Sequence, residues 1–170
     1  KDDKLKKQKW EETRFNLWIV FLHLLSVLVL GLSLFPMIFF FHWAWKAMGV
    51  YAGWFKILVF SFSIAFGYFL FGAVLIVVCV LVKNIFGFKI KAGLFGIHSV
   101  DCLQWMGYNS LILIANSAFL DVLRLSPFQT LFYRAMGAKV GSSVNINTAG
   151  LADLSMLEIG DNVLIGGGVA

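Results

Sequence analysis

AKVGSSVNI at 138–146 and LEIGDNVLIGGGVA at 157–170 decide the expected fold, because the two stretches share one spacing. In each, two aliphatic residues stand six positions apart: Val140 with Ile146, and Ile159 with Ile165. Glycine follows three of these four residues, and a small or β-branched residue precedes three of them by two positions. This phasing predicts the hexapeptide repeats of a left-handed parallel β-helix, whose rungs turn one aliphatic side chain inward in every hexad.

The spacing breaks once, between the two stretches. From Ile146 to Ile159 the interval is one residue longer than two hexads, and unbroken phasing would turn Glu158 inward. The intervening residues 147–156 include Gly, Asn and Asp, so a bulge or loop is expected there. A coil takes roughly 18 residues and such repeats are stable only when stacked. Residues 138–170 are therefore interpreted as the first coils of a truncated β-helix that belongs to a larger protein.

Two long apolar segments precede the repeats. The chain has 170 residues, of which 60% are hydrophobic, more than a water-soluble domain of this size normally carries. Residues 15–41 and 57–82 contain no Asp, Glu, Lys or Arg, and each exceeds the roughly 20 residues that cross a hydrocarbon core. We expect a two-helix transmembrane hairpin over residues 15–83, with the first helix kinked or ended at Pro36.

Charged and aromatic residues at the ends of this hairpin predict how it sits in a membrane. Residues 1–14 are polar and are interpreted as a cytoplasmic linker or as the exposed first turns of a helix. Lysine and arginine are concentrated at the two outer ends, whereas Lys46 and Lys56 are the basic residues near the turn at 42–53. The positive-inside rule then predicts a multi-pass protein of the inner, cytoplasmic membrane, with its N-terminus and β-helix in the cytoplasm. Aromatic side chains near the turn form the expected interfacial belt: His42, Trp43, Trp45, Tyr51 and Trp54.

His23 is the ionisable side chain within the first apolar segment. We expect it to face the neighbouring helix or to lie near the membrane interface. A catalytic or proton-relay role is the alternative, because ionisable groups at membrane depth are costly and often functional.

Residues 84–137 are expected to lie along the membrane surface. The first part, 84–98, is predicted to be a loop, and 99–124 an amphipathic interfacial helix with Ser99 as its N-cap. The segment LILIA at 111–115 could instead form a strand. Proline in the first turn and glycine just beyond the last predict a short helix over 127–136.

The stretch 126–168 carries a family resemblance. It contains Ser126-Pro127, then YRAMGAKVG at 133–141, then the rung LEIGD at 157–161. These motifs resemble the membrane-bound terminal domain of nonribosomal-peptide-synthetase-like proteins, a family that includes the ε-poly-lysine synthetases and related hexapeptide transferases. The hairpin before this stretch agrees with the family in order but in no specific motif.

The resemblance implies a membrane-anchored acyl- or aminoacyl-transferase module that forms an amide or ester from a thioester. A phosphopantetheine carrier domain or coenzyme A would hold the thioester as acyl-CoA or its carrier-bound equivalent. Implied partners are the lipid bilayer and the carrier and adenylation domains of the same or a partner protein. More distant β-helix relatives acetylate sugars and small molecules, and many are trimers, so an oligomer is also open.

Three residues are the candidates for this chemistry. A histidine usually serves as general base in β-helix acyltransferases, and His98 is the histidine closest in sequence to the repeats. Arg134 and Lys139 flank the first rung and could hold a phosphate of the carrier arm or of coenzyme A. We expect no metal site, because the sequence has no metal-ligand spacing, and no nucleic-acid binding, because its lysines flank apolar runs instead of forming a stripe.

Other functions remain open at this point. One is a sugar or small-molecule O- or N-acetyltransferase, and another is a non-catalytic membrane anchor or scaffold. A γ-type carbonic anhydrase would need three histidine ligands that the rungs at 138–170 do not contain. A small-solute transporter is disfavoured, because the two apolar segments hold no ionisable pair.

Overall fold

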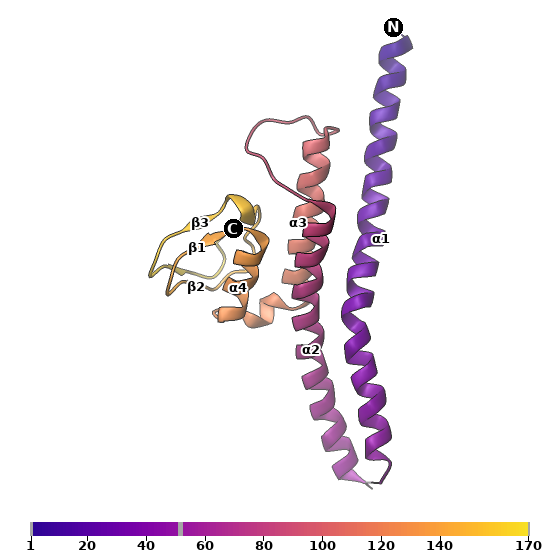
Figure 1. Ribbon diagram of the computed structural model, residues 1–170, viewed down its shortest axis with the longest axis vertical. Helices are drawn as coiled ribbons and strands as arrows, with labels where there is room; N and C mark the ends of the chain where they lie inside the picture. Colours follow the sequence, from indigo (N-terminus) through magenta and orange to yellow (C-terminus); the bar gives the residue numbers. More distant parts are fainter. Residues whose placement is uncertain (1, 51–52, 170) are drawn as a thin grey trace.

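The computed structural model describes residues 2–50 and 53–169, so the predicted belt residue Tyr51 lies outside the described residues. Two long antiparallel helices form a hairpin, and everything after residue 99 packs on one side of it, beside the half that is remote from the turn (Figure 1). The helical elements are α1 Asp2–Ala47, η1 Met48–Val50, α2 Trp54–Phe86, α3 Val100–Ala118, η2 Leu120–Leu123, α4 Pro127–Met136 and η3 Leu154–Met156. The strands are β1 Lys139–Val140, β2 Asn145–Ile146, β3 Glu158–Ile159 and β4 Leu164–Ile165.

Helices α1 and α2 form a helical hairpin, as the sequence predicts. Within the described residues they are the two helices long and apolar enough to cross a membrane, by length and composition. At 1.5 Å per residue, their 46 and 33 residues correspond to about 69 Å and about 50 Å. Both exceed the roughly 30 Å of a hydrocarbon core, so each helix is long enough to extend beyond it.

At two places in the first helix the structure decides between the alternatives that the sequence leaves open. Residues 2–14 are the first turns of α1 and not a separate linker, since their lysines and glutamates are good helix formers. Pro36 lies inside α1, which continues to Ala47. Proline removes one backbone hydrogen bond, but ending the helix among apolar side chains would leave several more backbone groups unpaired, so the helix persists.

Two glycines of α2 permit close packing. A Cβ atom on Gly67 would lie 2.6 Å from the Phe41 ring of α1, and a Cβ atom on Gly72 would lie 2.2 Å from the Phe119 ring. The second contact comes from the segment after α3, not from α1. Gly72 therefore sets where the following domain docks on the hairpin.

Helix α3 begins where the sequence predicts and ends earlier. The Ser99 side chain accepts a hydrogen bond from the Cys102 amide and caps the helix. The segment at 111–115 is helical, so the strand alternative is wrong. The single helix predicted over 99–124 instead stops at Ala118 and is followed by η2, because the Phe119 ring packs onto Gly72 and takes the backbone out of the helical region.

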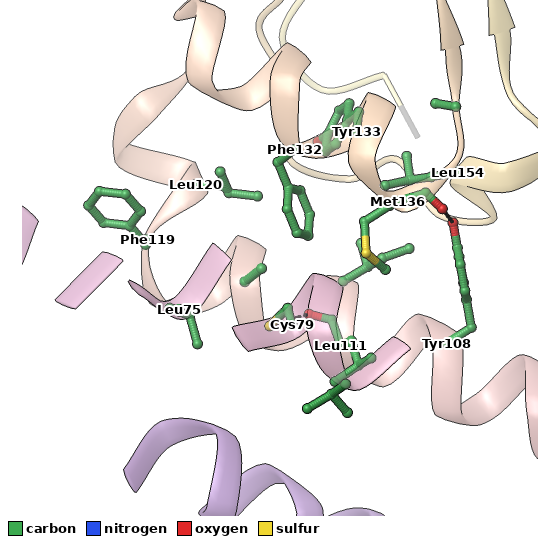
Figure 2. Packing of buried hydrophobic residues seen from close by; sticks show 14 of the residues in the cluster. Leu75, Cys79, Tyr108, Leu111, Phe119, Leu120, Phe132, Tyr133, Met136 and Leu154 are labelled. Carbon is green, nitrogen blue, oxygen red and sulfur yellow. Dashed lines mark hydrogen bonds between the residues drawn. The ribbon is translucent and has the colours of Figure 1, made fainter. Parts of the chain in front are cut away.

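A buried cluster joins α2, α3, α4 and η3, and Figure 2 shows its side chains converging between these elements. Tyr108 of α3 is fully buried, and its hydroxyl donates to the Met136 carbonyl at the end of α4 over 2.8 Å. Gly137 then ends α4 in the left-handed conformation with φ of 119°, as predicted for a C-cap. The last helix and the strands are thus fixed to the hairpin through α3.

The strands pair in parallel, in two two-stranded sheets within the described part of the chain. Lys139 aligns with Glu158 and Asn145 aligns with Leu164, so each pair is offset by 19 residues. Ile146 and Ile159 are buried while the Glu158 side chain is exposed, which places the extra residue in the loop before β3, as expected. The pairs are short and do not form a closed β-helix, so that part of the predicted fold is not confirmed.

Candidate functional site

A groove of about 830 Å³ opens between α1, α3 and the loop before η3. Helix α1 contributes residues 19–26, α3 contributes residues from 105 to 117, and the loop contributes 149–152. Its apolar side chains include Leu22, Ile112 and Leu113. The polar residues that line it are His23, Ser26, Asn109, Ser110, Asn116, Ser117 and Asp121. A groove that joins an apolar wall to several polar groups suits an amphiphilic ligand.

His23 brings an ionisable group to the α1 side of this groove. Its Nδ1 lies 2.8 Å from the Ile19 carbonyl oxygen, one turn earlier in the same helix. A carbonyl only accepts hydrogen bonds, so in the neutral ring Nδ1 carries the proton and Nε2 keeps its lone pair. The imidazole is therefore held in the tautomer that can accept a proton at Nε2.

Asn116 brings a buried amide to the α3 side of the groove. The side chain is only 7% exposed, and its Nδ2 donates to the Ala149 carbonyl. That acceptor fixes the amide orientation, because the opposite flip would bring two oxygens together. Oδ1 is left buried with no hydrogen-bond partner among the described residues. Such an unpaired acceptor is unfavourable unless a ligand or water supplies a donor.

Asp153 fastens the loop that forms the third wall. One of its carboxylate oxygens accepts hydrogen bonds from Trp105 Nε1 and from Asn109 Nδ2, both over 2.7 Å. Asn109 Oδ1 in turn accepts from the Asp153 amide over 3.1 Å. Asp153 itself has φ of 51°, a left-handed conformation that Asp tolerates better than most residues. These reciprocal bonds hold the loop against α3, so the groove is pre-formed.

His98, the predicted general base, lies elsewhere. It precedes the N-cap of α3, its carbonyl accepts a hydrogen bond from Arg14, and its ring meets the edge of Phe15 at a centroid distance of 5.3 Å. It is not among the residues that line the groove. The structure therefore brings a different histidine, His23, to the cavity.

Arg134 and Lys139, the predicted phosphate-binding residues, both have partners within the fold. Arg134 donates from Nε to the Val140 carbonyl over 3.0 Å and from its terminal nitrogen to the Gly141 carbonyl, which links α4 to β1. Lys139 forms an exposed ion pair with Glu158 across the paired strands, with 3.2 Å between nitrogen and oxygen. Neither residue lines the groove.

Two further ionisable groups support the strand region. Burial raises the pKa of Tyr108 to about 12, so its hydroxyl stays protonated and keeps donating to Met136. The Ser142 amide and hydroxyl both donate to the Asp161 carboxylate, and these bonds lower the pKa of Asp161. Among the described residues, no group of three His, Cys, Asp or Glu side chains is placed to hold a metal ion.

The sequence contained one signal for this site. An ionisable residue inside a long apolar segment, as at His23, is unusual, but nothing in the local sequence relates it to Asn116 or to the loop at 149–152. Those three segments meet only through the packing of α3 on the hairpin. Comparison with protein-family models, with curated proteins and with solved structures found no match to this chain.

Proposed function

We propose that this chain is the membrane-anchored part of an acyl- or aminoacyl-transferase and that the groove receives the acyl acceptor. The observation that carries the proposal is that His23 lines a groove whose other lining residues are mostly apolar. The parallel strand pairs with inward Ile146 and Ile159 support it, because they agree with the expectation of a β-helix transferase.

The groove lies at a depth where a lipid changes from chain to head group. Taking the tryptophans near the turn as one interface, about 20 residues reach the other side of the hydrocarbon core. Counting back from Trp45 on α1 gives Leu25, and counting forward from Trp54 on α2 gives Val74. The groove is lined by residues 19–26 of α1, so it lies at this second boundary. An acceptor could keep its tail in lipid while its polar end meets His23.

In the proposed reaction, His23 Nε2 removes the proton from an acceptor amine or hydroxyl. The acceptor nitrogen or oxygen then bonds to the thioester carbonyl carbon, and the carbon–sulfur bond breaks. The departing thiolate takes the proton from the imidazolium, which restores the neutral ring. General-base catalysis of this kind typically contributes about 10²–10⁴-fold to a rate. The thioester would come from coenzyme A or a phosphopantetheine carrier domain on the cytoplasmic side.

The proposal includes the orientation of the hairpin in the membrane. Lysines and arginines at the outer ends of the hairpin favour a cytoplasmic N-terminus and cytoplasmic strands. Protease added to right-side-out vesicles should leave residues 138–169 intact, and protease added to inverted vesicles should cleave them. The reverse pattern would place the strands on the side where no carrier thioester is expected.

Transfer is tested with the chain in lipid nanodiscs, radiolabelled acetyl-CoA and hexadecanoyl-CoA, and a panel of long-chain amines and alcohols. His23→Gln should lower the transfer rate by about 10²-fold or more, while His98→Gln should stay near the unaltered chain. The opposite result would assign the base to His98. If no thioester and acceptor pair yields product, the chain is a non-catalytic anchor and the proposal fails.

A further inference from the structure

We propose that the groove binds a long-chain membrane amphiphile whose polar end carries a hydrogen-bond donor, and that Asn116 Oδ1 accepts that donor. This inference deepens the proposed function by naming the class of acceptor, a long-chain primary amine, which has one N–H for Asn116 Oδ1 and a second for His23 Nε2, and so rests on it for its catalytic meaning. A long-chain alcohol has a single O–H, so it can bind at Asn116 but cannot serve both groups at once. The binding itself does not depend on acyl transfer.

The buried amide selects the chemistry of the polar end. Asn116 is only 7% exposed, and its Nδ2 donates a hydrogen bond to the Ala149 carbonyl. Oδ1 is a buried acceptor with no donor among the residues that the structure describes, and it belongs to a residue that lines the groove. A ligand with an O–H or N–H group would satisfy it, whereas an ether or ester of the same length would leave it unpaired.

The apolar lining of the groove favours a ligand with a hydrocarbon tail. Leu22, Ile112, Leu113, Ile114 and Leu151 supply apolar lining, and no fixed cation faces the groove among the described lining residues. Asp121, the acidic residue of the lining, is paired with Arg124. A phosphate or carboxylate head group would therefore meet a carboxylate and neutral amides, so an anionic amphiphile is disfavoured and a neutral or cationic one is favoured.

The exposed surface of α1 beside the groove is apolar, which would give a ligand access from lipid. On either side of His23 along α1, the exposed side chains are apolar, including Val20, Leu24 and Val27. These residues lie near the proposed hydrocarbon boundary, so the mouth of the groove is continuous with a surface that lipid chains would cover. The ligand can enter sideways from the bilayer without passing through water.

The test is photo-crosslinking in nanodiscs with a hexadecanol that carries a diazirine in its tail, and no acyl donor is present. Labelling should map to the groove residues and be competed by 1-hexadecanol and by hexadecylamine. Hexadecyl methyl ether should compete at least about fivefold more weakly, because it leaves Oδ1 unpaired. Equal competition by ether and alcohol, or labelling that avoids the groove, would overturn the proposal and leave water as the partner of Oδ1.

Variants test separately how the Asn116 amide and the walls of the groove contribute to binding. Asn116→Leu should abolish the preference for alcohol over ether, and Gln104→Leu, at an amide of the same helix that does not line the groove, should keep it. Ala152→Trp should block labelling by filling the mouth from the loop side. Thermal unfolding followed by tryptophan fluorescence checks that each variant folds, and if Asn116→Leu does not, the alcohol-to-ether ratio in the unaltered chain decides alone.

The outcomes distinguish this inference from the proposed function. Selective binding with no acyl transfer would remove the transferase and keep the amphiphile site. Acyl transfer to acceptors without any preference for a donor-bearing competitor would keep the transferase and remove the inference.

Discussion

The two halves of the hairpin are built from similar apolar sequence but are stabilised differently. The half near the turn, residues 30–47 and 54–67, exposes large apolar side chains on its outer faces, such as Phe35, Phe39 and Phe62. Its serines donate within their own helices, as Ser33 does to the Val29 carbonyl. This turn half depends on its surroundings to cover its side chains.

The remote half, residues 14–29 and 68–86, makes side-chain hydrogen bonds to other elements. Trp18 Nε1 donates to the Leu103 carbonyl over 2.9 Å, and the Tyr68 hydroxyl donates to the Ala118 carbonyl over 3.1 Å. Lys83 reaches the Ala135 carbonyl over 3.1 Å. The comparison teaches that one continuous pair of helices has two parts, an exposed apolar half near the turn that is apolar enough for a membrane, and a scaffold for α3 and α4 farther away.

The largest expected effect comes from placing a charge on the turn half. Phe39 is 66% exposed, and Phe39→Lys should disfavour membrane insertion by about 2.5–3.5 kcal/mol if this face meets lipid. Leu131→Lys on α4, where the leucine is 61% exposed, is the matched control and should insert normally. Carbonate extraction of membranes measures the integrated fraction. Equal behaviour of the two variants would contradict the membrane role of the turn half.

A smaller effect is expected where the segment after α3 packs on the remote half of the hairpin. Gly72→Ala would push a methyl group into the Phe119 ring, and overpacking of this kind costs about 1–3 kcal/mol. Gly31→Ala in α1 has open space around the added carbon and should be neutral or stabilising. Unfolding in detergent with added denaturant compares the two. If Gly72→Ala is as stable as Gly31→Ala, Phe119 does not determine the docking.

Tyr108→Phe removes the hydrogen bond to Met136 and should cost about 1 kcal/mol. The folded-state pKa of about 12 lies above the ordinary value of 10.0. The unfolded chain therefore releases this proton first, so stability is full below pH 10 and falls as pH rises toward 12. Denaturant unfolding between pH 8 and pH 12 should show a shallower alkaline loss in Tyr108→Phe. An unchanged slope would mean that Tyr108 does not carry this loss.

The smallest effect is expected for the exposed Lys139–Glu158 ion pair between the paired strands. Lys139 and Glu158 are both largely exposed, so Glu158→Gln should change stability by less than about 1 kcal/mol. Ile159→Ala, at the neighbouring buried position, is the contrast and should cost about 2–5 kcal/mol. Similar losses in both variants would show that the strand pair is not arranged with Ile159 inward.

Features encoded by a few adjacent residues were predictable from sequence. Ser99 at the start of α3, and Pro127 and Gly137 at the two ends of α4, act through local backbone chemistry, and the structure confirms all three. The loop before β3 follows from one surplus residue in a six-residue spacing, and the offset of 19 agrees with it.

The sequence did not predict features that depend on packing between elements far apart in the chain. The early end of α3 results from the Phe119 ring meeting Gly72, and no local signal at Phe119 announces it. The groove needs Asn116 and the loop at 149–152 to be brought against α1 beside His23, which only the docking of α3 achieves. A histidine in an apolar segment indicated that a site could exist, but not what it would face.

The bonds from Asp153 to Trp105 and Asn109 have a mechanical consequence. They make the loop wall move together with α3, while the opposite wall belongs to α1. A hairpin responds to bilayer thickness by tilting. In the proposed membrane arrangement, a tilt of α1 relative to α3 would change the spacing between the two walls, so membrane composition would control how readily the groove admits the proposed amphiphile.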